Sequence, residues 1–218
     1  MMASTRGHGA SKKGSGYERA TAKKLSKWTG ENYMRTLQSG AGGTRAVDDL
    51  RMTGDIFAPL GSPNAFSYEC KDHATTKLQQ VFNNNGDIPS FWEQCTTDCR
   101  RVSKYGYSPM LIFHINREAD YVLTPFTEWL RENLIEIEAP CQCQRTWYTQ
   151  ERTQLKYQFD TILTTLDSIT KLPPLQMFKK YQFLDWDRLN KDLHKDTKSA
   201  DEVVDQLLDN IEDEVNKP

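Results

Sequence analysis

Apolar residues near the start of the chain recur at the spacing of an α-helix. Tyr17, Leu25 and Trp28 fall on one face of such a helix, and Gly30 follows the last of them. Glycine readily adopts the left-handed conformation that ends many helices. The pattern therefore predicts a helix over residues 16–28.

Further along, short apolar runs predict strands, and two segments between or after them return to helical spacing. The run at residues 108–115 is apolar almost throughout, which is typical of a buried central strand. Helices are expected at residues 88–106 and from Pro125 to about Leu134. The predicted strands lie at residues 32–38, 55–59, 65–71, 108–115 and 120–124.

This order of elements indicates an α/β (α+β) fold, in which a central mixed β-sheet is flanked by helices. After Pro140 the spacing is helical again at residues 157–169 and 203–215, so a mainly helical C-terminal extension is expected. We divide the chain into a flexible basic arm (1–13), a core (14–134) and an extension with an acidic tail (135–218).

The formal net charge of −2 conceals an uneven distribution. Residues 1–30 carry seven Lys or Arg against one acid, whereas residues 185–218 carry eleven acids against five bases. A basic front favours a polyanionic partner, and the acidic tail is suited to dimerisation, to DNA mimicry or to a protein partner. No run approaches the roughly 18 apolar residues of a membrane span, which excludes an integral membrane protein.

The five cysteines are an odd number, and no secretory signal precedes them, so we expect a reducing, intracellular compartment. Cys95 and Cys99 are four residues apart, and Cys141 and Cys143 are closer than in a zinc knuckle. Ordinary core or surface thiols are therefore favoured over a structural zinc site.

The stretch AFSYECKDH places charged residues inside a predicted strand, with Glu69 and Lys71 on the same face. If the loop LGSPN is centred on Ser62, Asp55 falls directly opposite Glu69, with Cβ atoms about 4.5 to 5.5 Å apart. Two opposed carboxylates destabilise a sheet unless a cation lies between them. Carboxylate oxygens, waters and a substrate phosphate are typical ligands of Mg²⁺, so the pattern points to phosphodiester chemistry.

These residues resemble the signature of the PD-(D/E)XK nuclease superfamily, which is an acid, a hairpin-length gap and then E-x-K. Here Asp55 lies in GDIFAP, Glu69 and Lys71 form ECK, and Glu18 lies in KKGSGYERATAKKL, where the superfamily often carries a helix glutamate. KKGSGYERA, SGAGG and the hairpin resemble archaeal Holliday junction resolvases. The helix SFWEQCTTDCRRV with the strands after it is similar to RecU-type resolvases.

The resemblance implies a restriction-endonuclease-like core and a Mg²⁺ ion, replaceable by Mn²⁺, held by Glu18, Asp55 and Glu69. Lys71 would orient the attacking water, and Gln94 would lie near the site. The products would carry a 5′-phosphate and a 3′-hydroxyl. For Gln94, an ordinary position on an exposed helix face is an equally good interpretation.

The resemblance covers residues 12–128, and Gly54 replaces the usual proline before the aspartate. It also gives the basic front a role, because lysine and arginine bind DNA phosphates without reading sequence. Ser39 resembles a serine near the resolvase site, although a turn or cap role is the more common one for a loop serine. The expected DNA-binding residues are Lys12, Lys13, Arg19, Lys23, Lys24, Lys27, Arg35, Ser39, Arg45 and Arg51.

We therefore expect a Mg²⁺-dependent endodeoxyribonuclease of the Holliday junction resolvase type, acting as a homodimer on branched DNA in recombination or repair. A bacterial or phage protein working in the cytoplasm fits this expectation. The nearest alternative is another repair or restriction-like nuclease of the superfamily. An alternative from a different class is a non-catalytic DNA-binding or assembly factor built on the nuclease fold.

Overall fold

The strands form one mixed seven-stranded sheet, in the order β1-β2-β3-β4-β5-β7-β6. The computed structural model describes residues 6–36 and 53–187, with side chains from residue 14 onward. Among the described strands, β3 and β4 are parallel and the other neighbouring pairs are antiparallel. The strands are β1 (Met34–Arg35), β2 (Ile56–Phe57), β3 (Phe66–Asp72), β4 (Ser108–His114), β5 (Asp120–Pro125), β6 (Cys141–Thr149) and β7 (Lys156–Thr165).

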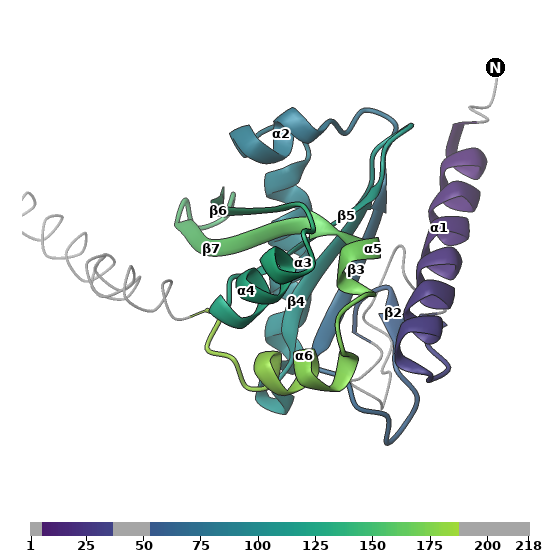
Figure 1. The fold of residues 1–218 in the computed structure, drawn as a ribbon. Coiled ribbons are helices and arrows are strands. Elements are labelled where there is room, and N and C mark those ends of the chain that lie inside the picture. The colour runs from purple at the N-terminus through teal and green to yellow at the C-terminus, as the bar shows by residue number, and fades with distance from the viewer. Residues whose placement is uncertain (1–5, 37–52, 188–218) are drawn as a thin grey trace, which may run out of the picture.

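Helices cover both faces of the sheet, so the architecture has three layers. Buried residues of α1, α4, α5 and α6 share one apolar cluster with the sheet, and those of α2 and α3 share the other. Figure 1 shows α1 lying along the side of the sheet near β2 and β3. The helices are α1 (Arg6–Thr29), α2 (Leu78–Asn83), α3 (Ile88–Val102), α4 (Glu128–Glu136), α5 (Leu166–Ile169) and α6 (Pro174–Tyr181).

The predicted α/β class and mixed sheet are confirmed. The central strand β3 also alternates as predicted. Tyr68 and Cys70 point into the cluster beneath α1. Glu69 pairs in register with Leu111, a member of the cluster beneath α3, so Glu69 and Lys71 lie on the α3 face. The two sides of β3 therefore present an apolar surface to one layer and charged groups to the other.

The prediction of a helix over residues 157–169 is wrong for the residues up to Thr165, which form β7, and right for Leu166–Ile169, which form α5. This strand lies between β5 and β6. Its consecutive residues Ile162 and Leu163 are buried in opposite clusters. A strand covered on both faces has no polar alternation, so its apolar run cannot be told from a helix by spacing alone.

Other boundaries differ from expectation. Helix α1 begins at Arg6, ten residues before the predicted start, and α2 was not predicted. The division at residue 134 stays a prediction, although β6 and β7 belong to the same sheet as the other strands. The acidic helix expected at residues 203–215 lies outside the described residues. Among the helices described, none has the length and apolar character to cross a membrane.

Candidate active site

The hairpin between β2 and β3 has the predicted register. Ile56 pairs with Tyr68, as expected for a loop centred on Ser62. Asp55 directly precedes β2, and its backbone N–H donates to the carbonyl of Tyr68 at 2.8 Å. Its side-chain Oδ2 accepts a hydrogen bond from the backbone N–H of Cys70, also at 2.8 Å. Asp55 is therefore bonded to the backbone of both residues that flank Glu69 in β3, Tyr68 and Cys70.

The glycine before this aspartate is required by the backbone. Gly54 has a φ of +87°, and a Cβ there would lie 2.5 Å from the carbonyl oxygen of Tyr68. Proline fixes φ near −65°, so it cannot adopt this conformation. The departure from the superfamily's proline thus follows from how closely this chain passes β3 before Asp55.

Lys71 lies between two oxygen acceptors on the α3 face. Its Nζ is 2.6 Å from Oε1 of Glu69 and 2.7 Å from Oε1 of Gln94 on α3. The same ammonium lies 5.5 Å from the centre of the Phe91 ring. The sequence left open whether Gln94 lies near the site or on an ordinary exposed helix face. The structure brings Gln94 into contact with Lys71.

The two carboxyl groups are buried, with Asp55 7% and Glu69 2% exposed. Burial raises the pKa of Asp55 to about 6, and the charge of Glu18 contributes to the rise. Burial raises the pKa of Glu69 to about 8, and the charge of Asp55 contributes. Because the ionised forms are disfavoured by burial and by each other, a cation placed between them would be stabilising.

Two carboxylates fit a Mg²⁺ ion, which often binds one or two protein carboxylates and keeps several waters. Within residues 14–36 and 53–187, no three His, Cys, Asp or Glu side chains are grouped so as to hold a metal. Glu18 is buried on α1, and its carboxylate forms an ion pair with Arg35. The role of Glu18 as a third ligand stays a prediction.

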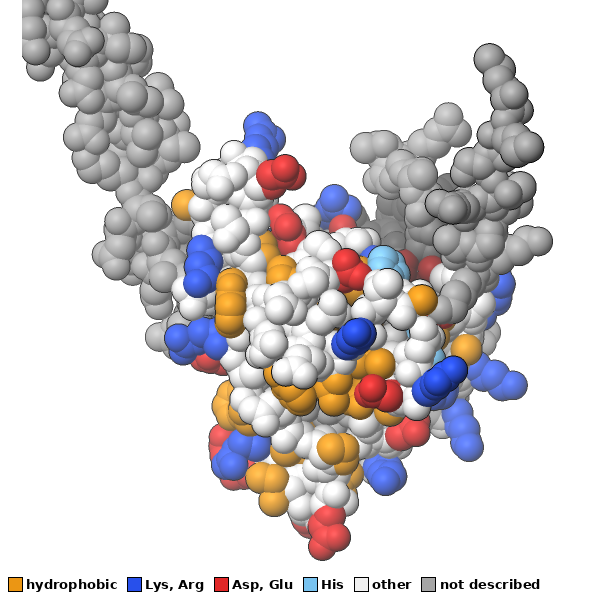
Figure 2. All heavy atoms as spheres, turned by 90° about the horizontal axis from the view of Figure 1, so that it is seen from above, with side chains coloured by type: hydrophobic (Ala, Val, Ile, Leu, Met, Phe, Trp, Pro, Cys, Tyr) orange, Lys and Arg blue, Asp and Glu red, His pale blue; other side chains and the backbone are white. Residues whose placement is uncertain are grey.

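The expected DNA-binding residues divide into three groups. Ser39, Arg45 and Arg51 lie outside the described residues, as do the side chains of Lys12 and Lys13. The exposed side chains on α1 include Arg19, Lys23 and Lys27. Several basic side chains lie at the right-hand edge in Figure 2, on the side where Figure 1 places α1.

The third group is engaged with acids of the protein. Arg35 pairs with Glu18, as described above. Lys24 lies 2.7 Å from Asp120 and 3.6 Å from Asp167. The Nδ1 atom of His114 also lies 2.9 Å from Oδ1 of Asp120. The ion pairs of Arg35 and Lys24 dock α1 onto β1, β5 and α5. A count of basic residues could not distinguish this structural role from DNA binding.

Sequence reasoning overlooked Asp98 and Arg101. Asp98 lies one turn after Gln94 on α3, and its Oδ1 contacts Nη1 of Arg101 at 2.8 Å. The charge of Asp98 contributes to the raised pKa of Asp55 and of Glu69. The four-residue spacing from Gln94 was the available signal, because residues so spaced share a helix face.

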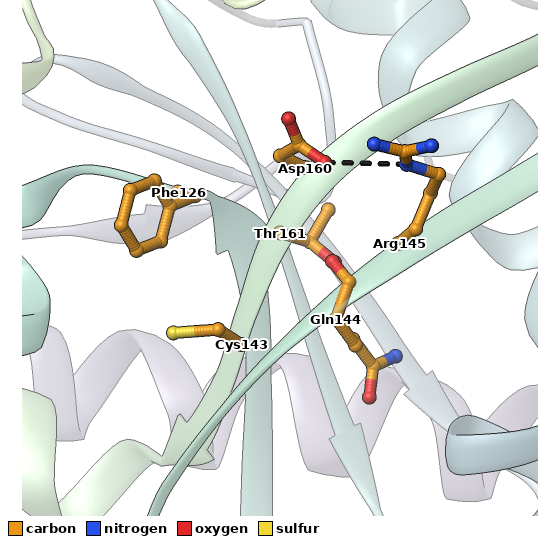
Figure 3. Close-up of a pocket in the computed structure, with 6 residues that line it drawn as sticks. All are labelled: Phe126, Cys143, Gln144, Arg145, Asp160 and Thr161. Atoms are coloured by element: carbon orange, nitrogen blue, oxygen red, sulfur yellow. Dashed lines mark hydrogen bonds and ion pairs between the residues drawn. The ribbon is translucent and has the colours of Figure 1, made fainter.

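A pocket elsewhere on the sheet contains none of these residues. It lies along β6 and β7, and Figure 3 shows Phe126 and Cys143 at one end with Arg145 and Asp160 at the other. The Arg145–Asp160 ion pair, at 3.4 Å, joins the two strands across it. Asp160 is already paired with Arg145, and burial raises the pKa of the Cys143 thiol, so neither group is activated for catalysis in this pocket.

Comparison with known proteins identifies a family. No curated protein and no solved structure matches the chain. A family described as "Phage putative PDDEXK endonuclease" matches residues 9–179, which include α1 from residue 9 onward, the hairpin with Asp55 and Glu69, and all of α3. The match covers most of the sequence and extends through β7. The chain therefore belongs to this family of phage PDDEXK endonucleases.

Proposed function

We propose that the protein is a Mg²⁺-dependent DNA endonuclease that cleaves branched DNA, leaving a 5′-phosphate and a 3′-hydroxyl. The observation that carries the proposal is the buried pair Asp55 and Glu69, with Lys71 held between Glu69 and Gln94. Burying two acids beside one lysine costs stability, which a purely structural hairpin has no need to incur.

Each side chain has a distinct task in this proposal. Asp55 and Glu69 would hold the Mg²⁺ ion, with Mn²⁺ able to replace it. When bound, the ion would activate a water and stabilise negative charge on the phosphate. Lys71 has three N–H donors, of which Glu69 and Gln94 accept two. The third is available to orient the attacking water.

The choice of branched DNA rests on different support. KKGSGYERA, SGAGG and the E-x-K hairpin resemble Holliday junction resolvases. The exposed lysines and arginine of α1 suit phosphate contacts, which recognise the shape of DNA rather than its sequence. A homodimer would allow symmetric cuts on two strands. We place this activity in the host cytoplasm, in recombination or repair of phage DNA.

The test is cleavage of end-labelled DNA substrates by the purified protein. Four-way junctions, flaps, nicked duplexes and linear duplexes are each incubated with Mg²⁺, Mn²⁺ or EDTA, and the cut sites are mapped on each strand. The proposal predicts metal-dependent cuts placed symmetrically about the junction. Equal cleavage of all substrates would indicate a nuclease of another specificity, and binding without cleavage would indicate the non-catalytic alternative.

A further inference from the structure

Helix α3 runs antiparallel to β3 and passes directly over the candidate active site. The rings of Phe91 and His73 are 4.7 Å apart, and three residues later Gln94 contacts Lys71 at 2.7 Å. As α3 advances, its partners on β3 therefore come from earlier in that strand. The next turn of α3, which begins at Asp98, lies level with the middle of β3.

Asp98 is near enough to interact electrostatically with Asp55, Glu69 and Lys71. Its side chain is 21% exposed. Burial raises the pKa of Asp98, and the positive charges of Arg101 and Lys71 oppose that rise. The contact of Asp98 with Arg101 thus joins a group at the edge of the site to a residue on the surface.

The two consecutive arginines at the end of α3 differ sharply. Arg100 is engaged by the carboxylate of Asp187 through two hydrogen bonds, at 2.9 and 3.0 Å, and by the hydroxyl of Tyr148 at 2.7 Å. Within the described part of the chain, Arg101 contacts the carboxylate of Asp98 alone, and its side chain is 62% exposed. A guanidinium has five N–H donors, so Arg101 keeps N–H groups that face solvent.

We propose that Arg101 binds a DNA phosphate next to the one being cleaved, and that Asp98 is a positioning residue that holds the Arg101 side chain toward the site. This inference rests on the proposed function, since it assigns a further contact to the same substrate. Arginine presents a planar fork that matches two phosphate oxygens. Its positive charge would also offset the repulsion between the phosphate and three nearby acids, Asp55, Glu69 and Asp98.

The structure offers a matched control. Arg131 on α4 forms the same kind of contact, an ion pair with Glu128 three residues earlier, and its side chain is 39% exposed. Helix α4 packs against β6 and places Arg131 beside Cys143, whereas α1 packs against β1 and β3 near the other end of the sheet order, so Arg131 is remote from Lys71 and from the lysines of α1. Replacing Arg131 therefore removes a comparable charge and ion pair without touching the proposed DNA path.

The experiment measures binding separately from cleavage. Binding of a labelled four-way junction and of a duplex is followed at several salt concentrations, in an Asp55→Asn background that cannot cut. Arg101→Ala should weaken binding about 5- to 20-fold and reduce the slope of log affinity against log salt by about one, whereas Arg131→Ala should change neither. Arg101→Lys should recover only part of the loss, because it lacks the fork.

The role of Asp98 is tested with a double mutant. Asp98→Asn should weaken binding about 2- to 5-fold when Arg101 is present and have no added effect in Arg101→Ala, since a positioning residue acts through its partner. In the cleaving protein, Arg101→Ala should raise KM about 5- to 10-fold with a smaller change in kcat.

The inference is overturned if Arg101→Ala and Arg131→Ala bind DNA equally well. The positioning role of Asp98 is overturned if Asp98→Asn weakens binding as much in the Arg101→Ala variant as in the protein that retains Arg101. Failure of the proposed function looks different, because the wild-type protein would then cut none of the substrates while the Arg101 dependence of binding persisted.

Discussion

The Oδ2 atom of Asp55 accepts a 2.8 Å hydrogen bond from the backbone N–H of Cys70. A carboxylate that the proposed chemistry needs is thus oriented by the main chain of the neighbouring strand. Glu69, which the register places opposite Asp55 and which directly precedes Cys70, supplies the second acid. Because the backbone of β3 is fixed by pairing with β4, the position of Asp55 is set by the sheet itself.

Asp55→Asn should abolish cleavage while leaving the fold intact. The amide oxygen can still accept from the N–H of Cys70, but the charge that attracts a metal ion is lost. We expect a loss of at least about 100-fold in kcat/KM, which corresponds to about 3 kcal/mol. Cleavage assays check the activity, and circular dichroism with urea unfolding checks the fold.

The matched control for this variant is Asp160→Asn, which changes an exposed acid on β7 that pairs with Arg145. It should keep full activity. Near-normal cleavage by Asp55→Asn would remove Asp55 from the site, whereas a parallel loss in stability would mean that the carboxylate is structural.

Without divalent ions, the protein should become less stable as the pH rises from about 5 to about 8. The folded-state pKa values of Asp55 and Glu69 are raised to about 6 and about 8. Unfolded carboxyl groups titrate near pH 4, so over this range the folded state binds more protons than the unfolded state. The free energy of unfolding therefore falls with pH, by up to about 1.4 kcal/mol per pH unit for each carboxyl group that is still protonated in the folded state.

Urea unfolding in EDTA at a series of pH values measures this slope. Adding Mg²⁺ at pH 8 should recover most of the loss, because the ion replaces the protons between the two acids. Asp55→Asn should show a shallower slope. A stability that rises with pH in EDTA would contradict the raised pKa values.

Lys24→Ala should affect DNA binding less than Lys23→Ala does. Lys24 is 2.7 Å from Asp120 and 3.6 Å from Asp167, so its charge is already compensated within the protein. Lys23 is exposed on the same helix. Because the Lys24 side chain is 44% exposed, we expect its loss to cost less than about 1 kcal/mol of stability.

Fluorescence anisotropy with labelled DNA compares the two variants, and the slope against salt should fall for Lys23→Ala alone. Equal losses of affinity would mean that Lys24 leaves Asp120 when DNA binds. An unchanged affinity for Lys23→Ala would place the DNA away from this part of α1.

Asn84→Ala should destabilise the protein and promote its self-association. The side-chain amide of Asn84 donates to the carbonyl of Trp147 at 2.7 Å and accepts from its N–H at 3.1 Å. It thereby covers backbone groups of β6, which lies at the end of the sheet order. We expect a loss of about 2 to 3 kcal/mol, from two hydrogen bonds and from alanine at a φ of 47°.

Asn84→Gly separates the two causes, since glycine tolerates this φ but lacks the amide. It should be less destabilised than Asn84→Ala yet associate equally, because exposed strand edges pair with other chains. Urea unfolding and size-exclusion chromatography provide the measurements. An Asn84→Gly variant with the same oligomeric state as the wild-type protein would show that the β6 edge is protected by other means.

The residues of the hairpin could be placed from the sequence because the rules involved are local. Side-chain alternation put Glu69 and Lys71 on one face of β3, and the turn residues of LGSPN fixed the register that pairs Ile56 with Tyr68. The continuous apolar run of β4 likewise marked a central strand. Strand period and turn chemistry depend on neighbours in the chain, so they can be predicted from the sequence without a structure.

Only the tertiary structure decided which charged side chains meet. Packing of α1 pairs Glu18 with Arg35 and Lys24 with Asp120, and packing of α3 brings Gln94 to Lys71. It also buried β7 on both faces, which erased the alternation that would have identified it as a strand. Contacts between elements depend on how whole layers pack together. That packing is determined by many residues at once, so no single spacing in the sequence predicts it.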